Sequence, residues 1–153
     1  MIILRIAEGI RNHFPARASE WALAAGLSHW GRIVYNEPSI FNRPGFSQMA
    51  EWAEPRTWGL AAMTVGGIRL IALVINGTFA DTRYGQISPH VRGATAFLSC
   101  FVWLQIYLGL QISGDTTTGL GIYPYLLALD CYNTARAFGD AGEADRAKKY
   151  GGS

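Results

Sequence analysis

Long apolar stretches alternate with short polar stretches along the chain after Pro15. Four of the apolar stretches approach the roughly 20 residues that a helix needs to cross the hydrocarbon core of a membrane, and they cover residues 17–35, 57–76, 93–114 and 119–138. The third stretch carries no formal charge, whereas Arg69 interrupts the second and Asp130 the fourth. The first stretch is rich in alanine and contains His29 and Arg32. This pattern predicts an all-α protein, an integral membrane bundle of four transmembrane helices that forms one membrane domain over residues 1–153.

A soluble helical bundle with unusually apolar core helices is the alternative, because only the third stretch is both long and free of charge. Surface helices of soluble proteins carry a polar stripe at 3.6-residue spacing, and none of the four stretches has such a stripe filled with Lys and Glu. Aromatic residues that prefer the boundary between lipid and water gather near the ends of the stretches: Trp21, Tyr35, Trp52, Trp58, Tyr84, Tyr123 and Tyr125. Charged residues make up 16% of the chain, whereas about 25% is usual for a soluble domain. These observations favour the membrane.

The first 14 residues predict an amphipathic helix that precedes the four crossings. Its apolar side has helical spacing and its polar side is charged: Ile3, Ile6, Ile10 and Phe14 on one side, and Arg5, Glu8 and Arg11 on the other. The charges exclude the unbroken apolar region of a cleavable signal peptide. Pro15 then stops or bends the helix. Such a helix lies flat on a bilayer surface or packs on the rest of its own protein, and the sequence leaves both possibilities open.

The distribution of Lys and Arg predicts that both termini are cytoplasmic, because positive residues are retained on that side. Nine of them fall on the side of the termini (Arg5, Arg11, Arg17, Arg83, Arg92, Arg136, Arg146, Lys148 and Lys149), and three fall on the other side (Arg32, Arg43 and Arg56). The loop over residues 36–56 is then periplasmic in a bacterium. Its apolar positions predict a short interfacial helix, with Phe46, Met49, Ala50 and Ala53 at helical spacing. Residues 140–153 form a polar, frayed cytoplasmic tail.

Two charged residues inside the predicted crossings need a physical explanation. Arg69 and Asp130 lie at matching depth, each about 10 to 12 Å from the cytoplasmic boundary at 1.5 Å per residue. We expect them to form an ion pair that clamps two helices, since a single charge in lipid is costly. Two alternatives remain open at this point: the charges line a proton or ion path, or Arg69 extends to the inner headgroups.

Further polar and small residues favour a packed bundle over a wide pore. Four side chains are expected to form hydrogen bonds between helices: Asn76, Gln105, Gln111 and Asn133. Two pairs of small residues, each four positions apart, are expected to allow close approach of helix backbones: Ala22 with Gly26, and Ala62 with Gly66.

The sequence contains no motif of a known enzyme class. It has no phosphate-binding glycine loop, no His-Glu-x-x-His and no Gly-x-Ser-x-Gly, so we predict no catalytic residue and no cofactor. The three histidines lie far apart, and we predict no metal site. Cys100 and Cys131 lie in apolar stretches and are expected to be reduced packing residues. The formal charge of +2 gives no basis for binding nucleic acid in a sequence-specific way.

Short segments over most of the chain resemble small multi-pass membrane proteins of phages and prophages of Gram-negative bacteria. They are Trp58-Gly59, Gly67-Ile68-Arg69-Leu70, Asn76-Gly77-Thr78, Thr118-Gly119, Tyr123-Pro124, Asp130, Tyr132-Asn133 and Arg136-Ala137. The resemblance implies a non-enzymatic role at the host inner membrane: holin-like lysis, delivery of DNA by a virion-carried protein, or exclusion of competing phage. Its implied partners are the lipid bilayer, further copies of the chain, and other membrane or virion proteins. The alternative is a small cellular four-helix transporter, or an accessory subunit of a membrane complex, in which Arg69 and Asp130 are the working centre.

Overall fold

A computed structural model describes residues 2–79, 82–114 and 116–150, and within these ranges the protein is helical and contains no strand. Four long helices carry the fold: α1 (Ile2–Asn36), α3 (Pro55–Thr78), α4 (Arg83–Ser113) and α5 (Gly119–Tyr150). Between α1 and α3 lie two short 3-10 turns, η1 (Pro38–Asn42) and η2 (Pro44–Phe46), and a short helix, α2 (Ser47–Trp52). The all-α prediction is confirmed.

The helix ends follow from local sequence. Pro55 occupies the first turn of α3, where its missing N–H costs nothing, and Gly114 ends α4 with a φ of 66°. The Thr82 hydroxyl caps the start of α4 by accepting from the Gly85 N–H at 3.3 Å. Helix α4 begins ten residues before the third apolar stretch. One expectation needs correction, because α5 continues as a regular helix through the expected frayed tail as far as Tyr150.

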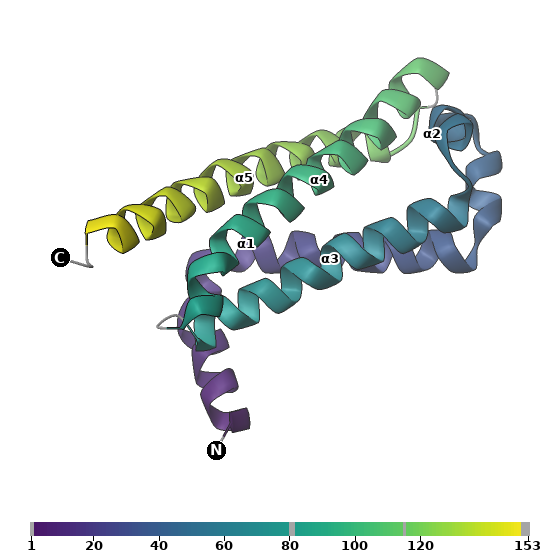
Figure 1. Cartoon of the computed structure of the whole chain (residues 1–153). Coiled ribbons are helices and arrows are strands. Elements are labelled where there is room, and N and C mark those ends of the chain that lie inside the picture. The colour runs from purple at the N-terminus through teal and green to yellow at the C-terminus, as the bar shows by residue number, and fades with distance from the viewer. Residues whose placement is uncertain (1, 80–81, 115, 151–153) are drawn as a thin grey trace.

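Helix α1 bends where the sequence predicts a stop or a bend. Pro15 cannot donate a backbone hydrogen bond, and Arg17 has the non-helical dihedrals φ −130° and ψ 22°. The part of α1 before the bend runs at an angle to the rest of the helix (Figure 1), and it passes close to the end of α3, since a Cβ at Gly9 would lie 2.6 Å from the Gly77 carbonyl oxygen. Phe14 on its predicted apolar side is exposed. The side chains of the other members of that side (Ile3, Ile6 and Ile10) lie outside the described residues, as does that of Arg5.

The long helices pack as two antiparallel pairs, α1 with α3 and α4 with α5, and α3 joins the pairs by packing on α4 (Figure 1). Glycines bring α1 and α3 close together. A Cβ at Gly31 would lie 2.6 Å from the Gly59 carbonyl oxygen, and a Cβ at Gly66 would lie 2.7 Å from the Ala24 carbonyl oxygen. Contact between α1 and α5 is sparse by comparison, so the bundle is open along that side.

An apolar core fills the end of the bundle where α2 lies. It contains Leu27, Val34, Phe41, Phe46, Met49, Trp58, Ala62, Val102, Trp103, Ile106 and Leu110. A short helix is present in the loop as α2. Of the four residues expected on its apolar face, Phe46 and Met49 are buried in this core, Ala53 is half-buried and Ala50 is exposed, and Phe46 and Ala53 lie just outside the helix. The Trp58 indole N–H holds the loop in place by donating to the Met49 carbonyl at 2.9 Å.

Two of the described helices, α3 and α4, are long and apolar enough to cross a membrane, whereas the sequence predicts four such helices. Both α1 and α5 have sufficient length, but charged residues lower their average hydropathy. In α1 these include Arg17 and Glu20, and in α5 they include Asp130 and Asp140.

Candidate functional site

The two charges that the sequence analysis paired are in contact inside the bundle. Arg69 on α3 donates from Nη1 to Oδ1 of Asp130 on α5 at 2.6 Å, and both side chains are fully buried. The other carboxylate oxygen, Oδ2, accepts from the indole N–H of Trp103 at 2.9 Å and from the hydroxyl of Ser99. Because Ser99 and Trp103 belong to α4, Asp130 connects three helices.

A second set of buried and half-buried charges lies about three helical turns from the first along α5, where Asp140 is ten residues beyond Asp130. Arg92 on α4 holds Glu20 on α1 with two parallel hydrogen bonds, from Nε to Oε2 at 2.9 Å and from Nη2 to Oε1 at 2.7 Å. Both side chains are fully buried. Asp140 on α5 accepts from Arg92 at 3.2 Å and from Arg17 at 2.9 Å, and Arg17 also reaches Glu20 at 3.2 Å.

Sequence analysis missed this second set. It assigned Arg17 and Arg92 to the charges that flank the crossings, and it assigned Asp140 to the tail. One signal was available, because Glu20 is a carboxylate inside the first apolar stretch and needs a partner as much as Asp130 does. Arg69 and Asp130 are therefore not the only charges inside the bundle.

The six residues Arg17, Glu20, Arg69, Arg92, Asp130 and Asp140 form what we call the charge network. Among the described residues it balances three guanidinium groups against three carboxylates. A buried ion without a partner costs several kcal/mol, so the balance allows these groups to lie in the bundle. Both oxygens of Glu20 and both oxygens of Asp130 already accept hydrogen bonds. This arrangement fits a clamp that holds helices together better than it fits a carboxylate that exchanges protons.

Of the four amide side chains expected to join helices, two do so. Asn133 on α5 accepts from the Ser19 hydroxyl on α1 at 2.9 Å, and Asn76 on α3 accepts from Arg92 on α4 at 3.5 Å. Gln111 instead donates to the Tyr107 hydroxyl on its own helix at 2.9 Å. Gln105 has no side-chain hydrogen bond within the part of the chain that the structure describes.

The two predicted pairs of small residues differ in their surroundings. Ala62 is buried and Gly66 lies against the α1 backbone, so this pair provides the expected close approach. Ala22 and Gly26 are both exposed, and a Cβ added at Gly26 would meet no atom within 4 Å. On α1 the positions that meet α3 closely include Ala24 and Gly31, whereas Gly26 faces open space.

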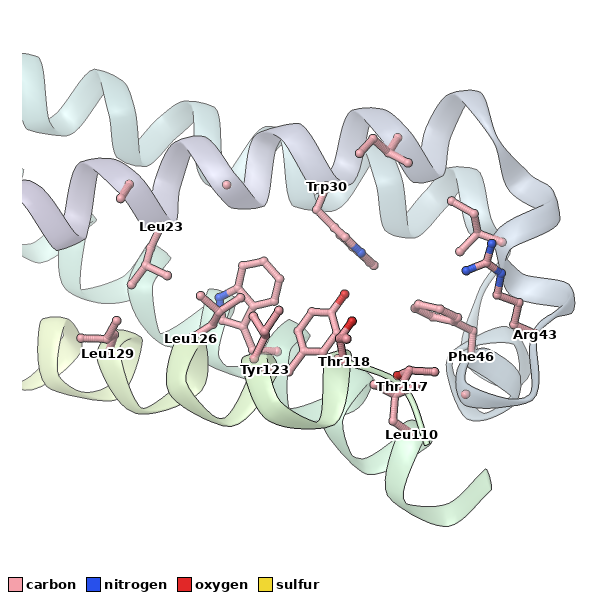
Figure 2. Close-up of a pocket in the computed structure, with 18 of the residues that line it drawn as sticks. Leu23, Trp30, Arg43, Phe46, Leu110, Thr117, Thr118, Tyr123, Leu126 and Leu129 are labelled. Carbon is pink, nitrogen blue, oxygen red and sulfur yellow. The ribbon is translucent and has the colours of Figure 1, made fainter. Parts of the chain in front are cut away.

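Ala22 and Gly26 line a cleft of about 640 Å³ on the open side of the bundle, between α1 and α5 (Figure 2). Its walls are mainly apolar and aromatic: Leu23, Trp30, Phe46, Tyr123, Leu126 and Leu129. The two cysteines lie elsewhere. Their sulfur atoms are 3.7 Å apart, within hydrogen-bonding distance and not joined by a disulfide, and Cys131 is exposed rather than packed. Within the described ranges, no group of three or more His, Cys, Asp or Glu side chains is arranged to hold a metal ion.

No protein-family model, no characterised protein and no solved structure matches this chain. The function is therefore argued from the burial, pairing and distribution of its own side chains.

Proposed function

We propose that the protein is an integral membrane protein in which α1, α3, α4 and α5 all cross the bilayer. The proposal rests on one observation: charged side chains are buried inside the helical bundle, and large apolar side chains are exposed on its outer surface. Four charged side chains are fully buried: Glu20, Arg69, Arg92 and Asp130. Large apolar side chains are exposed along α4: Phe97, Leu98, Phe101, Leu104, Leu108 and Ile112. In water-soluble proteins such charged residues are almost never fully buried unless they are paired, as they are here, and large apolar patches are rarely exposed.

The positions of the exposed charges support a band of hydrocarbon thickness. In α3, residues 57–78 contain Arg69 as their sole charged residue, and it is buried. At 1.5 Å per residue this segment is about 33 Å long, close to the roughly 30 Å of a hydrocarbon core. Exposed charges gather at the α2 end (Arg32, Glu37, Arg43, Glu51, Glu54 and Arg56) and at the opposite end (Arg83, Glu143, Asp145, Arg146, Lys148 and Lys149).

The pairing of internal charges, rather than the length of a charge-free segment, extends the proposal from two crossing helices to four. Glu20 is the sole charge of α1 between residues 18 and 31, and Asp130 is the sole charge of α5 between residues 119 and 135. Both lower the average hydropathy of their helices, yet both are turned into the bundle and paired. Lipid would therefore meet no charged group on these segments.

We assign the protein a non-enzymatic role of the phage type at a bacterial inner membrane, carried out by assembly with its own copies or with other membrane or virion proteins. The exposed apolar face of α4 offers an assembly surface, and the paired state of Glu20 and Asp130 leaves no free carboxylate for transport through a single copy. This role takes one of three forms: DNA delivery, a holin-like lesion or phage exclusion.

Cysteine labelling tests the four crossings directly. Cys100 and Cys131 are first replaced by alanine, and one cysteine is then introduced at the exposed position Ser39 or Ala147. With four crossings, a membrane-impermeant maleimide labels Ser39→Cys in intact spheroplasts, and it labels Ala147→Cys only after permeabilisation. If α3 and α4 alone cross, the two positions lie on the same side and label together, which would overturn the proposal.

Timed expression in a bacterium with a membrane-potential dye tests the role. Abrupt depolarisation supports a lesion or conduit made by assembled copies. A steady potential, together with tight co-purification of one cellular membrane complex, would favour the alternative of an accessory subunit. Proteomics of purified particles tests the virion-carried form.

A further inference from the structure

The cleft between α1 and α5 is elongated along the bundle. Its lining on α1 runs from Ser19 to Ile33, which is about 21 Å at 1.5 Å per residue, and its volume is about 640 Å³. A long and mainly apolar groove of this kind suits a hydrocarbon chain.

The two ends of the cleft differ in polarity. Toward the middle of the bundle, the walls are formed by Leu23, Leu126 and Leu129 (Figure 2). At the α2 end, the Arg43 guanidinium, the Trp30 ring nitrogen and the Tyr123 hydroxyl face into the cleft, near the hydroxyls of Thr117 and Thr118 (Figure 2).

The polar groups at the α2 end have no partner of their own. None of the side chains of Arg43, Trp30, Tyr123, Thr117 and Thr118 forms a hydrogen bond or ion pair within the part of the chain that the structure describes. Arginine stays charged at every accessible pH, and its planar fork suits phosphate oxygens. This end of the cleft thus offers one permanent positive charge and a group of hydrogen-bond donors, which complement the phosphate and ester oxygens of a lipid headgroup.

We propose that the cleft binds one anionic phospholipid, with an acyl chain between α1 and α5 and the phosphate at Arg43. The proposal rests on the membrane location proposed above, and the predicted topology places Arg43 at the outer leaflet. Ala22 and Gly26 then have a role that helix packing does not give them, because their small size leaves room for the acyl chain.

The test uses the full chain purified in mild detergent, with native mass spectrometry and a titration with phosphatidylglycerol or the zwitterionic phosphatidylcholine. We expect wild-type protein to retain one phosphatidylglycerol molecule and to bind it more tightly than phosphatidylcholine. Arg43→Gln removes a charged hydrogen-bond donor and should weaken phosphatidylglycerol binding about tenfold. It should weaken phosphatidylcholine binding less, because the choline cation already offsets the charge of the phosphate that Arg43 meets. Arg43 is exposed, so this variant should fold normally.

A matched pair of glycine variants tests the position of the acyl chain. Gly26→Leu fills the cleft, whereas Gly67→Leu places the same side chain on α3, where a Cβ also meets no atom within 4 Å but no part of the cleft is present. Leucine favours a helix more than glycine does, so both variants should fold. We expect Gly26→Leu to abolish retention and Gly67→Leu to preserve it. Equal retention in both variants, or wild-type protein without bound phospholipid, would overturn the lipid site.

The two proposals fail in distinguishable ways. A protein that passes the labelling test with four crossings but holds no phosphatidylglycerol refutes the lipid site alone. A protein whose Ser39→Cys and Ala147→Cys variants label on the same side refutes the four crossings, and the lipid site falls with them.

Discussion

Asp130→Ala removes the carboxylate on which α3, α4 and α5 converge. The change leaves the fully buried guanidinium of Arg69 without its ion-pair partner, which costs about 3 to 5 kcal/mol in comparable buried pairs. The Ser99 hydroxyl and the Trp103 indole N–H lose their acceptor as well, at about 1 to 3 kcal/mol each. Because these costs describe the same vacated site and overlap, we expect the free energy of unfolding to fall by about 4 kcal/mol.

Titration with sodium dodecyl sulfate in mixed micelles, followed by far-UV circular dichroism, measures this loss. A double-mutant cycle with Arg69→Met isolates the pair. With both charges removed, no unpaired ion remains in the bundle, so the double variant should lose at least about 2 kcal/mol less than the sum of the single variants.

Asp145→Ala is the matched control, because Asp145 is also on α5 and also forms a pair, with His90 at 3.2 Å. Both side chains of this pair are exposed, so we expect the free energy of unfolding to fall by no more than about 1 kcal/mol. The clamp is refuted if Asp130→Ala costs no more than Asp145→Ala, or if the losses from Asp130→Ala and Arg69→Met simply add.

Three further predictions follow from the packing. Gly31→Ala places a Cβ 2.6 Å from an α3 carbonyl oxygen and should lower the melting temperature, whereas Gly67→Ala meets open space and should leave it unchanged or raise it. A membrane-permeant oxidant should join Cys100 and Cys131 within one chain, since their sulfur atoms are 3.7 Å apart, and mass spectrometry after alkylation detects the bond. Glu20→Ala should lower the free energy of unfolding by about 3 kcal/mol, and Glu20→Gln should cost less because the amide oxygen still accepts a hydrogen bond; equal losses would contradict this account.

The amino-acid sequence is enough to predict the helical class, the bend after Pro15 and the pairing of Arg69 with Asp130. The first two features depend on the local chemistry of the backbone. The third depends on the free-energy cost of an unpaired buried charge, which is so large that few arrangements of the helices avoid it. Proline cannot continue a regular helix, Gly114 readily adopts the left-handed conformation that ends α4, and a charge far from any polar boundary needs a partner.

The face that each helix presents, and the set of other charges that lie inside the bundle, depend on how the helices pack together. The orientation of α1 about its own axis places Gly31 against α3 and leaves Gly26 facing the cleft. From the sequence, either glycine is small enough to lie at a close contact between two helices. Arg92 and Asp140 lie where an apolar stretch meets a polar one, so their position along the chain does not distinguish a flanking charge from a buried one. That distinction depends on which side chains of neighbouring helices approach, because burial of an ion becomes tolerable only when partners such as Glu20 arrive from a helix distant in sequence.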